Sequence, residues 1–312
     1  MAKPRILFMG TPAFALPSLQ ILHEQQYPII GVVSQPDRHQ GRGLKKVAPP
    51  VKILAQEFGL PIFQPEKVRD ASFLETFYQL KPDMVVVVAF GQILPKVIID
   101  YPPLQCLNIH PSLLPKYRGA APINWPIIRG ETKTGVTIML MDEGMDSGDI
   151  LLQQETEIGA AEIYGELHDR LAELGARLLI KTIEQMVGGT AKRKPQDVSG
   201  ATFAPRLKKE TGKIDWNNKV SDIVNLIRGL SPSPAAHTSM DGLPLKIFMA
   251  GAQPGNVKQP PGSIDTASAA GLPVAASDGY VILKDIQLAG KKRMLISDFL
   301  RGYRLNPETI LG

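Results

Sequence analysis

Residues 83–91 read DMVVVVAFG, a run in which consecutive valines leave no alternation between apolar and polar positions. A strand that is apolar on both sides is typical of a parallel sheet covered by helices on both faces. The shorter runs RILFMG (5–10) and IIGVVSQ (29–35) have the same character. Between these runs lie segments with helical periodicity, at 15–25, 51–59 and 71–81. The alternation predicts an α/β domain with a Rossmann-like, mostly parallel sheet.

The remainder of the first half extends this pattern and then changes character. Further strands are predicted at 106–110, 135–142 and 149–158. A long amphipathic helix is predicted at 162–187, where two glycines end it. The next twenty or so residues lack a clear period and are rich in charged and small residues, which is typical of a linker. We therefore expect a first domain, a linker and a second domain, at 1–189, 190–209 and 210–312.

The second domain has the pattern of a small antiparallel β structure. Asp241-Gly242 and Asp278-Gly279 each lie between two short apolar runs. In that setting Asp-Gly is the strongest short-range signal for a β-hairpin. One helix is predicted at 220–230. Hairpins at this spacing, with a single helix, predict a small OB-like β-barrel.

The composition is that of a soluble globular protein with one large or two ordinary domains. The chain has 312 residues, of which 44% are hydrophobic and 21% charged. No stretch has the features of a secretory leader or the length needed to cross a bilayer. The only cysteine, Cys106, lies in an apolar run, so a buried side chain in a reducing compartment is expected. We predict a cytoplasmic protein.

The charge is unevenly divided between the two halves. Residues 1–189 hold 18 Lys and Arg against 20 Asp and Glu, a net charge of −2, whereas residues 190–312 hold 17 against 10, a net charge of +7. A basic second half suggests a polyanionic partner. Charge alone favours the plainer alternative, a solvated basic face.

Two polar side chains end the strand predicted at 106–110. Asn108 and His110 are two positions apart, so both point to the same face of the sheet. A loop that contains Pro111 and Pro115 follows. Ligands of open parallel sheets bind beyond the carboxyl ends of the strands. The pair therefore indicates a site rather than two side chains that merely bind loop backbone.

A third candidate group lies in MDEGMDSGDI (141–150), which also follows a strand. Its four acids do not have the spacing of a calcium loop, and no His partners stand at ligand spacing, so we predict no metal. A carboxylate from this segment is better suited to orient the imidazole. Together, an amide, an imidazole and a carboxylate can stabilise a carbonyl oxygen that becomes anionic while they remove a proton from the attacking group.

Several other enzyme classes are disfavoured. The first strand ends in GTPAF (10–14) rather than G-x-G-x-x-G, and its proline removes a backbone donor that a phosphate would need. No G-x-x-x-x-G-K-[ST] loop is present. There is no G-x-S-x-G elbow, and the cysteine lies on a strand. The nucleophile is therefore expected to come from a substrate, which means direct transfer without a covalent enzyme intermediate.

The motifs resemble those of a known family. NIHPSLLPKYRGAAPI (108–123) resembles the signature of the folate-dependent formyltransferases, in which Asn and His precede an S-L-L-P loop. GVTIMLMDEGMDSGDIL (135–151) is similar to the segment that carries the family's aspartate. The resemblance covers nearly the whole chain, and the basic loop and the long C-terminal extension resemble those of the members that formylate methionyl-tRNA. It implies the formyltransferase fold.

The resemblance also implies roles for individual residues. A formyl group would pass from 10-formyltetrahydrofolate to the amino group of methionine on initiator tRNA. Asn108 and His110 would polarise the formyl oxygen, and Asp146 would pair with His110 and assist removal of the amine proton. The folate site would be formed by Phe90, Gln92, Ile93, Leu94, Ser112, Leu113, Leu114, Pro115 and Asp142. Two positions depart from the family pattern: Pro111, where glycine is common, and Phe90, where tyrosine is common.

The segment DRHQGRGLKKVAPP (37–50) is the candidate nucleic-acid contact. Glycines flank Arg42, and Lys45 and Lys46 follow, so a flexible loop could order on the tRNA acceptor end. Alone it would be taken for a solvated loop. Further candidate phosphate contacts around the linker are Lys192, Arg193, Lys194, Arg206, Lys208 and Lys209.

Two alternatives remain open, one within the family and one outside it. A formyltransferase that acts on a small amine, such as a glycinamide nucleotide or an amino sugar nucleotide, would use the same chemistry. A non-catalytic RNA-binding protein would need the basic second half but not the three polar side chains. We favour the tRNA substrate because of the basic loop and second domain, and we expect a monomer without membrane contacts.

Overall fold

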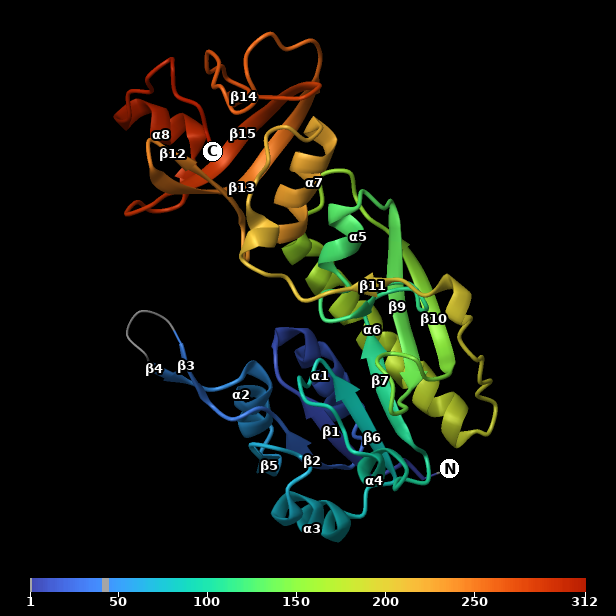
Figure 1. Cartoon of the computed structure of the whole chain (residues 1–312). Coiled ribbons are helices and arrows are strands. Elements are labelled where there is room, and N and C mark those ends of the chain that lie inside the picture. Colours follow the sequence, from blue (N-terminus) through green and yellow to red (C-terminus); the bar gives the residue numbers. More distant parts are fainter. Residues whose placement is uncertain (1, 41–44) are drawn as a thin grey trace. The chain divides into compact units, whose positions relative to one another are not determined.

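The computed structural model describes residues 2–40 and 45–312. The chain forms two compact units (Figure 1). Unit 1 is made of Met1–Gly119, Thr134–Thr156 and His168–Phe203. Unit 2 is made of Ala120–Lys133, Glu157–Leu167 and Ala204–Gly312. Unit 2 thus takes two short segments from the first half of the sequence.

Unit 1 is built on a seven-stranded sheet. Its strands are β1 (Ile6–Gly10), β2 (Ile29–Val33), β5 (Ile62–Phe63), β6 (Met84–Val88), β7 (Cys106–His110), β9 (Lys133–Leu140) and β10 (Ile150–Glu157). Its helices are η1 (Ala13–Ala15), α1 (Leu16–Glu24), α2 (Pro50–Glu57), α3 (Ala71–Leu80), α4 (Lys96–Ile99), α6 (Tyr164–Val187) and η2 (Val198–Gly200). A separate two-stranded pair is formed by β8 (Arg118–Gly119) and β11 (Phe203–Ala204).

The strand order is β10-β9-β7-β6-β1-β2-β5. The five strands from β7 to β5 pair in parallel, which confirms the predicted Rossmann-like, mostly parallel sheet. β9 pairs with β7 in the antiparallel direction, with His110 opposite Thr137. The two polar positions of β7 therefore lie between one parallel and one antiparallel neighbour.

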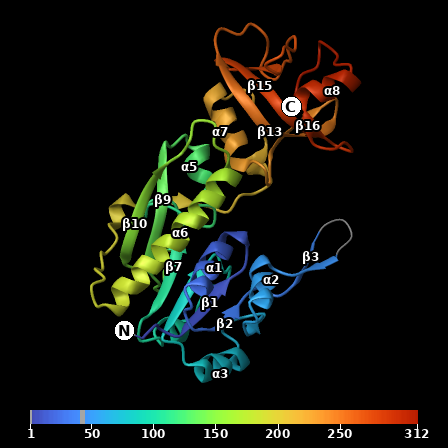
Figure 2. The same ribbon diagram turned by 180° about the vertical axis from the view of Figure 1, so that it is seen from behind.

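Helices cover both faces of this sheet, which explains the uninterrupted valines of β6. On one face, α1 and α6 lie over the strands (Figure 2). Gly175 of α6 approaches β7 so closely that a Cβ there would lie 2.9 Å from Ile109 Cγ2. On the other face, Phe73 and Phe77 of α3 pack with Val85 and Val87 of β6 in one apolar cluster.

The basic segment 37–50 contains a structure that the sequence did not predict. β3 (Arg38–Gln40) and β4 (Lys45–Val47) pair as an antiparallel hairpin, with His39 opposite Lys46. The expectation of a flexible loop is thus corrected at both ends of the segment. The pairing depends on backbone hydrogen bonds, which leave no periodic signal in a polar sequence. Arg42 lies outside the described residues.

Unit 2 contains an antiparallel β domain, as predicted. Its elements are α5 (Asn124–Ile128), η3 (Glu210–Gly212), α7 (Val220–Leu230), β12 (Ala236–Met240), β13 (Leu243–Pro254), β14 (Leu272–Ala276), β15 (Gly279–Leu288), β16 (Met294–Leu295) and α8 (Ile296–Gly302). The sheet order is β12-β13-β15-β14, and β16 also pairs with β15. Both predicted hairpins are present. Asp241 and Gly242 adopt φ values of 51° and 74°, the left-handed conformation that a two-residue hairpin turn requires.

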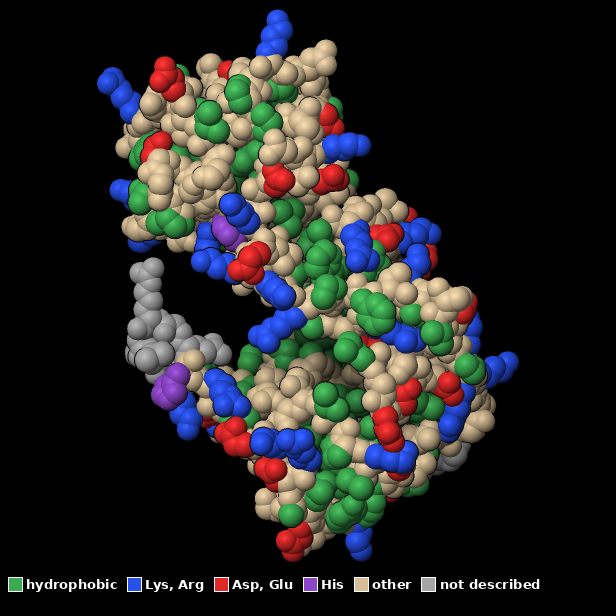
Figure 3. All heavy atoms as spheres, in the orientation of Figure 1, with side chains coloured by type: hydrophobic (Ala, Val, Ile, Leu, Met, Phe, Trp, Pro, Cys, Tyr) green, Lys and Arg blue, Asp and Glu red, His purple; other side chains and the backbone are tan. Residues whose placement is uncertain are grey.

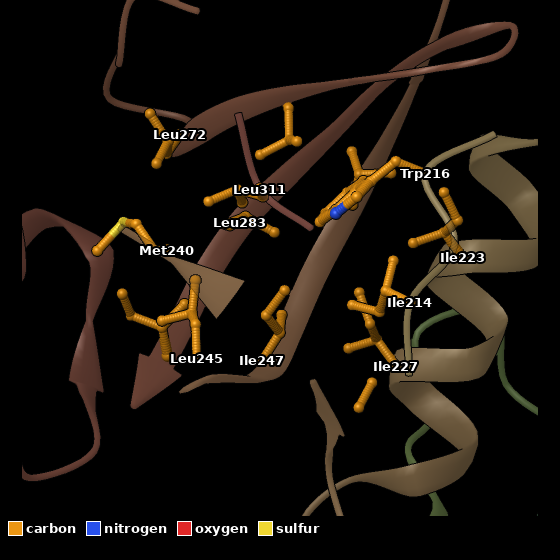
Figure 4. Packing of buried hydrophobic residues seen from close by; sticks show 14 of the residues in the cluster. Ile214, Trp216, Ile223, Ile227, Met240, Leu245, Ile247, Leu272, Leu283 and Leu311 are labelled. Carbon is orange, nitrogen blue, oxygen red and sulfur yellow. The ribbon is translucent and has the colours of Figure 1, made fainter. Parts of the chain in front are cut away.

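The core of unit 2 is apolar. Trp216, Ile227, Leu245 and Leu283 pack between α7 and the sheet (Figure 4). Trp216 is 4% exposed, and its indole Nε1 donates to Thr238 Oγ1 at 3.2 Å, so the one polar atom of this ring is satisfied. Among the described residues of the chain, no helix is both long and apolar enough to cross a membrane.

Candidate active site

The polar end of β7 lies on one face of the unit 1 sheet. Ile109 points toward α6, so by the alternation of a strand Asn108 and His110 point to the opposite face. Asn108 is paired with Val87 of β6 and Met139 of β9, and His110 is the last residue of the strand. The parallel direction of β1, β6 and β7 brings their carboxyl ends to the same edge, as expected for a site.

His110 is buried and both of its ring nitrogens face protein groups. Nε2 lies 3.0 Å from the carbonyl oxygen of Tyr117, and Nδ1 lies 3.6 Å from Asp146 Oδ1. Because a carbonyl oxygen only accepts, Nε2 must carry the proton of the neutral ring. Nδ1 is then an acceptor that faces a carboxylate, and it can bind that carboxylate only after it takes up a proton. The pair is arranged to receive a proton at Nδ1.

Asp146 is held beside His110 by an unusual loop. Its φ is +50°, in the left-handed region that non-glycine residues rarely adopt, and its Oδ2 accepts a hydrogen bond from the Gly119 N–H at 2.8 Å. The loop begins beside Cys106, at the start of β7, because β9 runs antiparallel to that strand. The carboxyl end of β9 thus lies beside the start of β7 and not beside His110. Asp146 reaches His110 because the loop after β9 folds back along the sheet.

Gly148 allows this loop to close. A Cβ at that position would lie 2.0 Å from the backbone oxygen of Leu140, which is a contact that only glycine avoids. Leu140 in turn donates its N–H to the carbonyl of Asp149 at 2.9 Å. The two ends of the Asp146 loop are thus drawn together by backbone contact.

Asn108 is the open member of the trio. Asn108 is partly exposed, and within residues 2–40 and 45–312 its side-chain amide makes no hydrogen bond. An amide group without a partner on the same face as His110 can donate to a ligand oxygen. Asn108, His110 and Asp146, which the sequence predicted as a site, therefore share one face of the sheet, with His110 and Asp146 in contact.

The loop after β7 is held by two polar side chains, one from β9 and one from β10. Thr137 Oγ1 donates to the Ser112 carbonyl at 2.6 Å and accepts from the Leu114 N–H at 3.2 Å. Gln153 Nε2 donates to the Leu114 carbonyl at 2.8 Å and to Thr137 Oγ1 at 2.9 Å. These bonds fix the conformation of the S-L-L-P loop.

The residues predicted to contact folate have different surroundings. Ser112 is fully buried, and its hydroxyl donates to the Lys116 carbonyl at 2.7 Å. Phe90, Leu94 and Leu114 are also buried. Leu113 and Pro115 are partly exposed. The folate contacts of all these residues remain predictions. The buried side chains pack inside unit 1 and can support the exposed ones.

Ile93 and Asp142 are the most open of that set. Ile93 is 91% exposed, which is unusual for a large apolar side chain. With Gln92 it lines a pocket, together with Lys67, Val68 and Arg69. Asp142 is exposed and accepts from the Ser147 hydroxyl at 2.9 Å.

Gln92 has a structural function that its side chain already performs. Its Oε1 accepts from the Val68 N–H at 2.9 Å, and its Nε2 lies 3.3 Å from the carbonyl oxygens of Pro65 and Glu66. Just after β1 and β2, respectively, the Thr11 hydroxyl and the Gln35 side-chain amide both donate to the Phe90 carbonyl. The turn after β6 is therefore fixed from both sides.

Cys106 is the first residue of β7, at the other end of the strand from His110, and it is unsuited to nucleophilic chemistry. Its side chain is 1% exposed, and its Sγ lies 3.4 Å from the Ile98 carbonyl. Burial, followed by the charge of Asp100, raises the pKa of the thiol far above its usual range. The prediction of a buried strand cysteine is confirmed.

The basic residues predicted to bind nucleic acid are exposed where they are described. They are Lys46, Lys192, Arg193, Lys194, Arg206, Lys208 and Lys209. Nothing is described of Arg42 or of the Lys45 side chain. On the face drawn in Figure 3, positive and negative side chains are interspersed on both units, so charge alone does not mark one contact surface. Among the described residues, no cluster of His, Cys, Asp and Glu could hold a metal ion.

Several residues that shape the site were missed by sequence reasoning. They are Tyr117, Gly119, Thr137, Gln153 and Gln196. The first two act through backbone groups, so no side-chain pattern could have revealed them. Gln196 lies in the segment expected to be a linker, yet its side chain binds the Asp146 loop.

Comparison with known proteins gives consistent matches. Residues 4–183 match the family described as formyl transferase, and residues 206–304 match the formyl transferase C-terminal domain. A methionyl-tRNA formyltransferase of Syntrophus aciditrophicus strain SB is 55% identical over 312 residues, 100% of both chains. That of Geotalea uraniireducens strain Rf4 is 48% identical over 100% of this chain and 99% of its own.

A solved structure shares the fold. An N-formyltransferase from Helicobacter canadensis, in complex with folinic acid and dTDP-3-aminofucose, matches with a TM-score of 0.67 and 20% identity. The match covers 94% of this chain and 100% of that one. At this identity the likeness concerns the fold alone.

Proposed function

This chain belongs to the formyl transferase family, as its motifs predicted, and on that premise we propose that it transfers a formyl group from 10-formyltetrahydrofolate to the amino group of methionyl initiator tRNA. The observation that carries the substrate assignment is the 55% identity to a methionyl-tRNA formyltransferase over the full length of both chains. The family and the folate-bound structural neighbour support a folate as the formyl donor.

The proposed reaction is a direct transfer. The methionyl amine attacks the formyl carbon, a C–N bond forms, and the carbonyl oxygen becomes anionic. The Asn108 amide donates a hydrogen bond to that oxygen. Collapse of the tetrahedral intermediate breaks the bond between the formyl carbon and N10, and tetrahydrofolate leaves with a proton on N10. No enzyme nucleophile is needed, which agrees with the buried, protonated Cys106.

His110 and Asp146 handle the proton of the incoming amine. His110 Nδ1 is the free base of the ring because Nε2 donates to Tyr117. Once Nδ1 takes the amine proton, the imidazolium lies 3.6 Å from the Asp146 carboxylate, which stabilises its charge. The proton can then pass to the departing N10. The contact of His110 with the formyl oxygen that the resemblance implies would require one of its two present contacts to open.

The folate is proposed to bind over the predicted residues around Ile93, Leu113 and Asp142. Exposed Ile93 offers an apolar surface to a flat ring, and the partly exposed Leu113 adds a second apolar side chain from a loop that Thr137 and Gln153 fix. Asp142 can accept from a ring N–H with the oxygen lone pairs that the Ser147 hydroxyl and the Gly144 N–H leave. The roles of Phe90 and Pro111, which depart from the family pattern, are part of the same prediction.

The tRNA acceptor end is proposed to contact the hairpin segment that contains Arg42, Lys45 and Lys46. The basic residues of 190–209 and of the proposed tRNA-binding domain 210–312 would add phosphate contacts. Residues 1–189 would hold the chemistry. A monomeric, cytoplasmic enzyme completes the proposal.

A transfer assay tests the substrate. Labelled 10-formyltetrahydrofolate is offered with methionyl-tRNA, with a glycinamide nucleotide and with an amino sugar nucleotide in parallel. We expect formylation of methionyl-tRNA only. Transfer to a small amine with no transfer to the tRNA would establish the alternative, whose present support is a fold likeness at 20% identity.

Salt dependence tests the tRNA contact. Arg42→Ala should raise the KM for methionyl-tRNA and make its dependence on salt shallower by about one in log–log slope, as for loss of one phosphate contact. Lys181→Ala, which removes an exposed cation from α6, is the control and should leave both unchanged. Identical kinetics in the two variants would count against a nucleic-acid contact at Arg42.

A further inference from the structure

Three consecutive residues after the S-L-L-P loop hold the His110–Asp146 pair. The Tyr117 carbonyl binds His110 Nε2, and the Gly119 N–H binds Asp146 Oδ2. Between them, the Arg118 side chain turns to Gln196, donating from Nε at 3.2 Å and from a terminal nitrogen at 2.7 Å to Gln196 Oε1. Arg118 is 8% exposed, so its guanidinium is fixed in place.

The other end of the Gln196 amide binds the Asp146 loop. Its Nε2 donates to the carbonyl of Asp146 at 2.9 Å and to the carbonyl of Gly148 at 2.8 Å. Both hydrogens of the amide are thus used on two carbonyls of one turn. Gln196 joins the segment that holds His110 to the loop that carries Asp146.

The Asp146 loop needs such an external contact. Asp146 adopts a φ of +50°, and a non-glycine residue in this conformation persists only when surrounding groups fix it. Its carboxylate has one backbone donor, Gly119, and its distance to His110 Nδ1 is 3.6 Å. A small rotation of the turn would therefore remove the carboxylate from reach of the imidazole.

We propose that Gln196 is a positioning residue for formyl transfer: its amide fixes the turn of Asp146 and thereby holds the carboxylate beside His110. This inference rests on the proposed function and deepens it. Gln196 lies in the 190–209 segment, so this part of the chain contributes to the chemistry of unit 1 as well as connecting the two halves of the sequence.

Two substitutions separate the two ends of the amide. Gln196→Ala removes all four contacts. Gln196→Glu keeps an oxygen for Arg118 but loses both donors to the Asp146 turn. If the donors matter, both variants should lower kcat by about 10- to 100-fold, with KM for tRNA and for folate within about twofold of wild type. Wild-type kcat in either variant would overturn the proposal.

A double-mutant cycle tests whether Gln196 acts through Asp146. In an Asp146→Asn background, Gln196→Ala should cause little further loss, because the carboxylate that it positions is already absent. An equal further loss in that background would mean that Gln196 acts elsewhere, and would overturn the proposal. Gln64→Ala is the matched control: Gln64 is another partly buried amide of unit 1, and its Nε2 donates to the Gln35 carbonyl and to Asp37 Oδ1 at 2.8 Å.

A spectroscopic measurement judges the inference without an activity assay. The chain has five histidines, so the ring signals of His110 can be assigned in a proton–nitrogen correlation spectrum by comparison with His110→Ala. These signals should shift in Gln196→Ala and remain in place in Gln64→Ala. Unchanged His110 signals in Gln196→Ala would overturn the proposal. An inactive wild-type enzyme would instead overturn the proposed function, and the His110 signals would still decide the inference.

Discussion

The two units treat a buried polar atom in different ways. In unit 2, the indole nitrogen of Trp216 is satisfied by the single hydroxyl of Thr238 inside an apolar core. In unit 1, His110 is satisfied by a backbone carbonyl and faces a carboxylate whose own loop depends on further backbone and amide contacts. The first arrangement stabilises a fold, whereas the second places one imidazole nitrogen 3.6 Å from a carboxylate at the candidate active site. Substitutions should therefore separate stability from chemistry.

The largest expected effect is on the stability of unit 2. Trp216→Ala removes a ring that is 4% exposed and should destabilise this unit by about 3–5 kcal/mol, from lost apolar burial and the cavity left behind. Urea unfolding followed by circular dichroism measures it. Leu243→Ala, at a side chain 46% exposed, is the control and should change the midpoint little. A decrease in the free energy of unfolding of less than about 1 kcal/mol would show that the Trp216 core does not stabilise unit 2 as proposed.

The next effect is on chemistry alone. His110→Ala should lower kcat for formyl transfer by about 10²–10⁴-fold, as for loss of a general acid–base group, while the affinity for tRNA stays near wild type. Single-turnover transfer and filter binding measure the two quantities. His168→Ala is the control, because His168 is another unit 1 histidine beside an acid, 2.8 Å from Asp169 Oδ1. Full activity in His110→Ala would exclude the proposed mechanism.

A smaller effect should follow from the Asp146 loop. In Gly148→Ala the new Cβ meets the Leu140 backbone oxygen at 2.0 Å, so the loop must move, and kcat should fall by about tenfold or more. In Gly144→Ala the new Cβ meets the Ser147 hydroxyl, a side chain that can rotate away. Steady-state kinetics should therefore distinguish the two variants. Equal kcat values would show that the position of Asp146 tolerates a shift of the loop.

The smallest effect concerns pH. Hydrogen bonds from Lys52 and Gln64 lower the pKa of Asp37 below its usual value. The folded state therefore favours the carboxylate, and this stabilisation is present above about pH 4 and is lost as the pH falls through the lowered folded pKa. The difference in urea midpoint between wild type and Asp37→Asn should be positive at pH 7 and vanish in acid.

The sequence predicted the elements that bury apolar faces. β1, β2, β6 and the long helix α6 lie within a few residues of their predicted ranges, because continuous or periodic apolar residues report burial directly. The hairpin β3–β4 and the pair β8–β11 were missed, since their pairing depends on backbone groups that every residue has.

The candidate site was predicted in part. Asn108 and His110 could be placed on one face from strand alternation, and the family resemblance singled out Asp146. The proximity of Asp146 to His110 did not follow from the parallel sheet, because β9 runs antiparallel and the loop folds back. Gln196 was not recognised, because periodicity detects buried faces and not an amide that binds two carbonyls.

The interleaved course of the chain restricts how this protein can be dissected or recombined. The polypeptide passes from one unit to the other five times, between 119 and 120, 133 and 134, 156 and 157, 167 and 168, and 203 and 204. A chimaera joined at residue 189 would replace Gln196, which belongs to unit 1. It would keep residues 120–133 and 157–167, which belong to unit 2, from the original protein. To exchange unit 2 intact, the junction belongs at Phe203/Ala204, and residues 120–133 and 157–167 have to come from the same source as the second part of the chain.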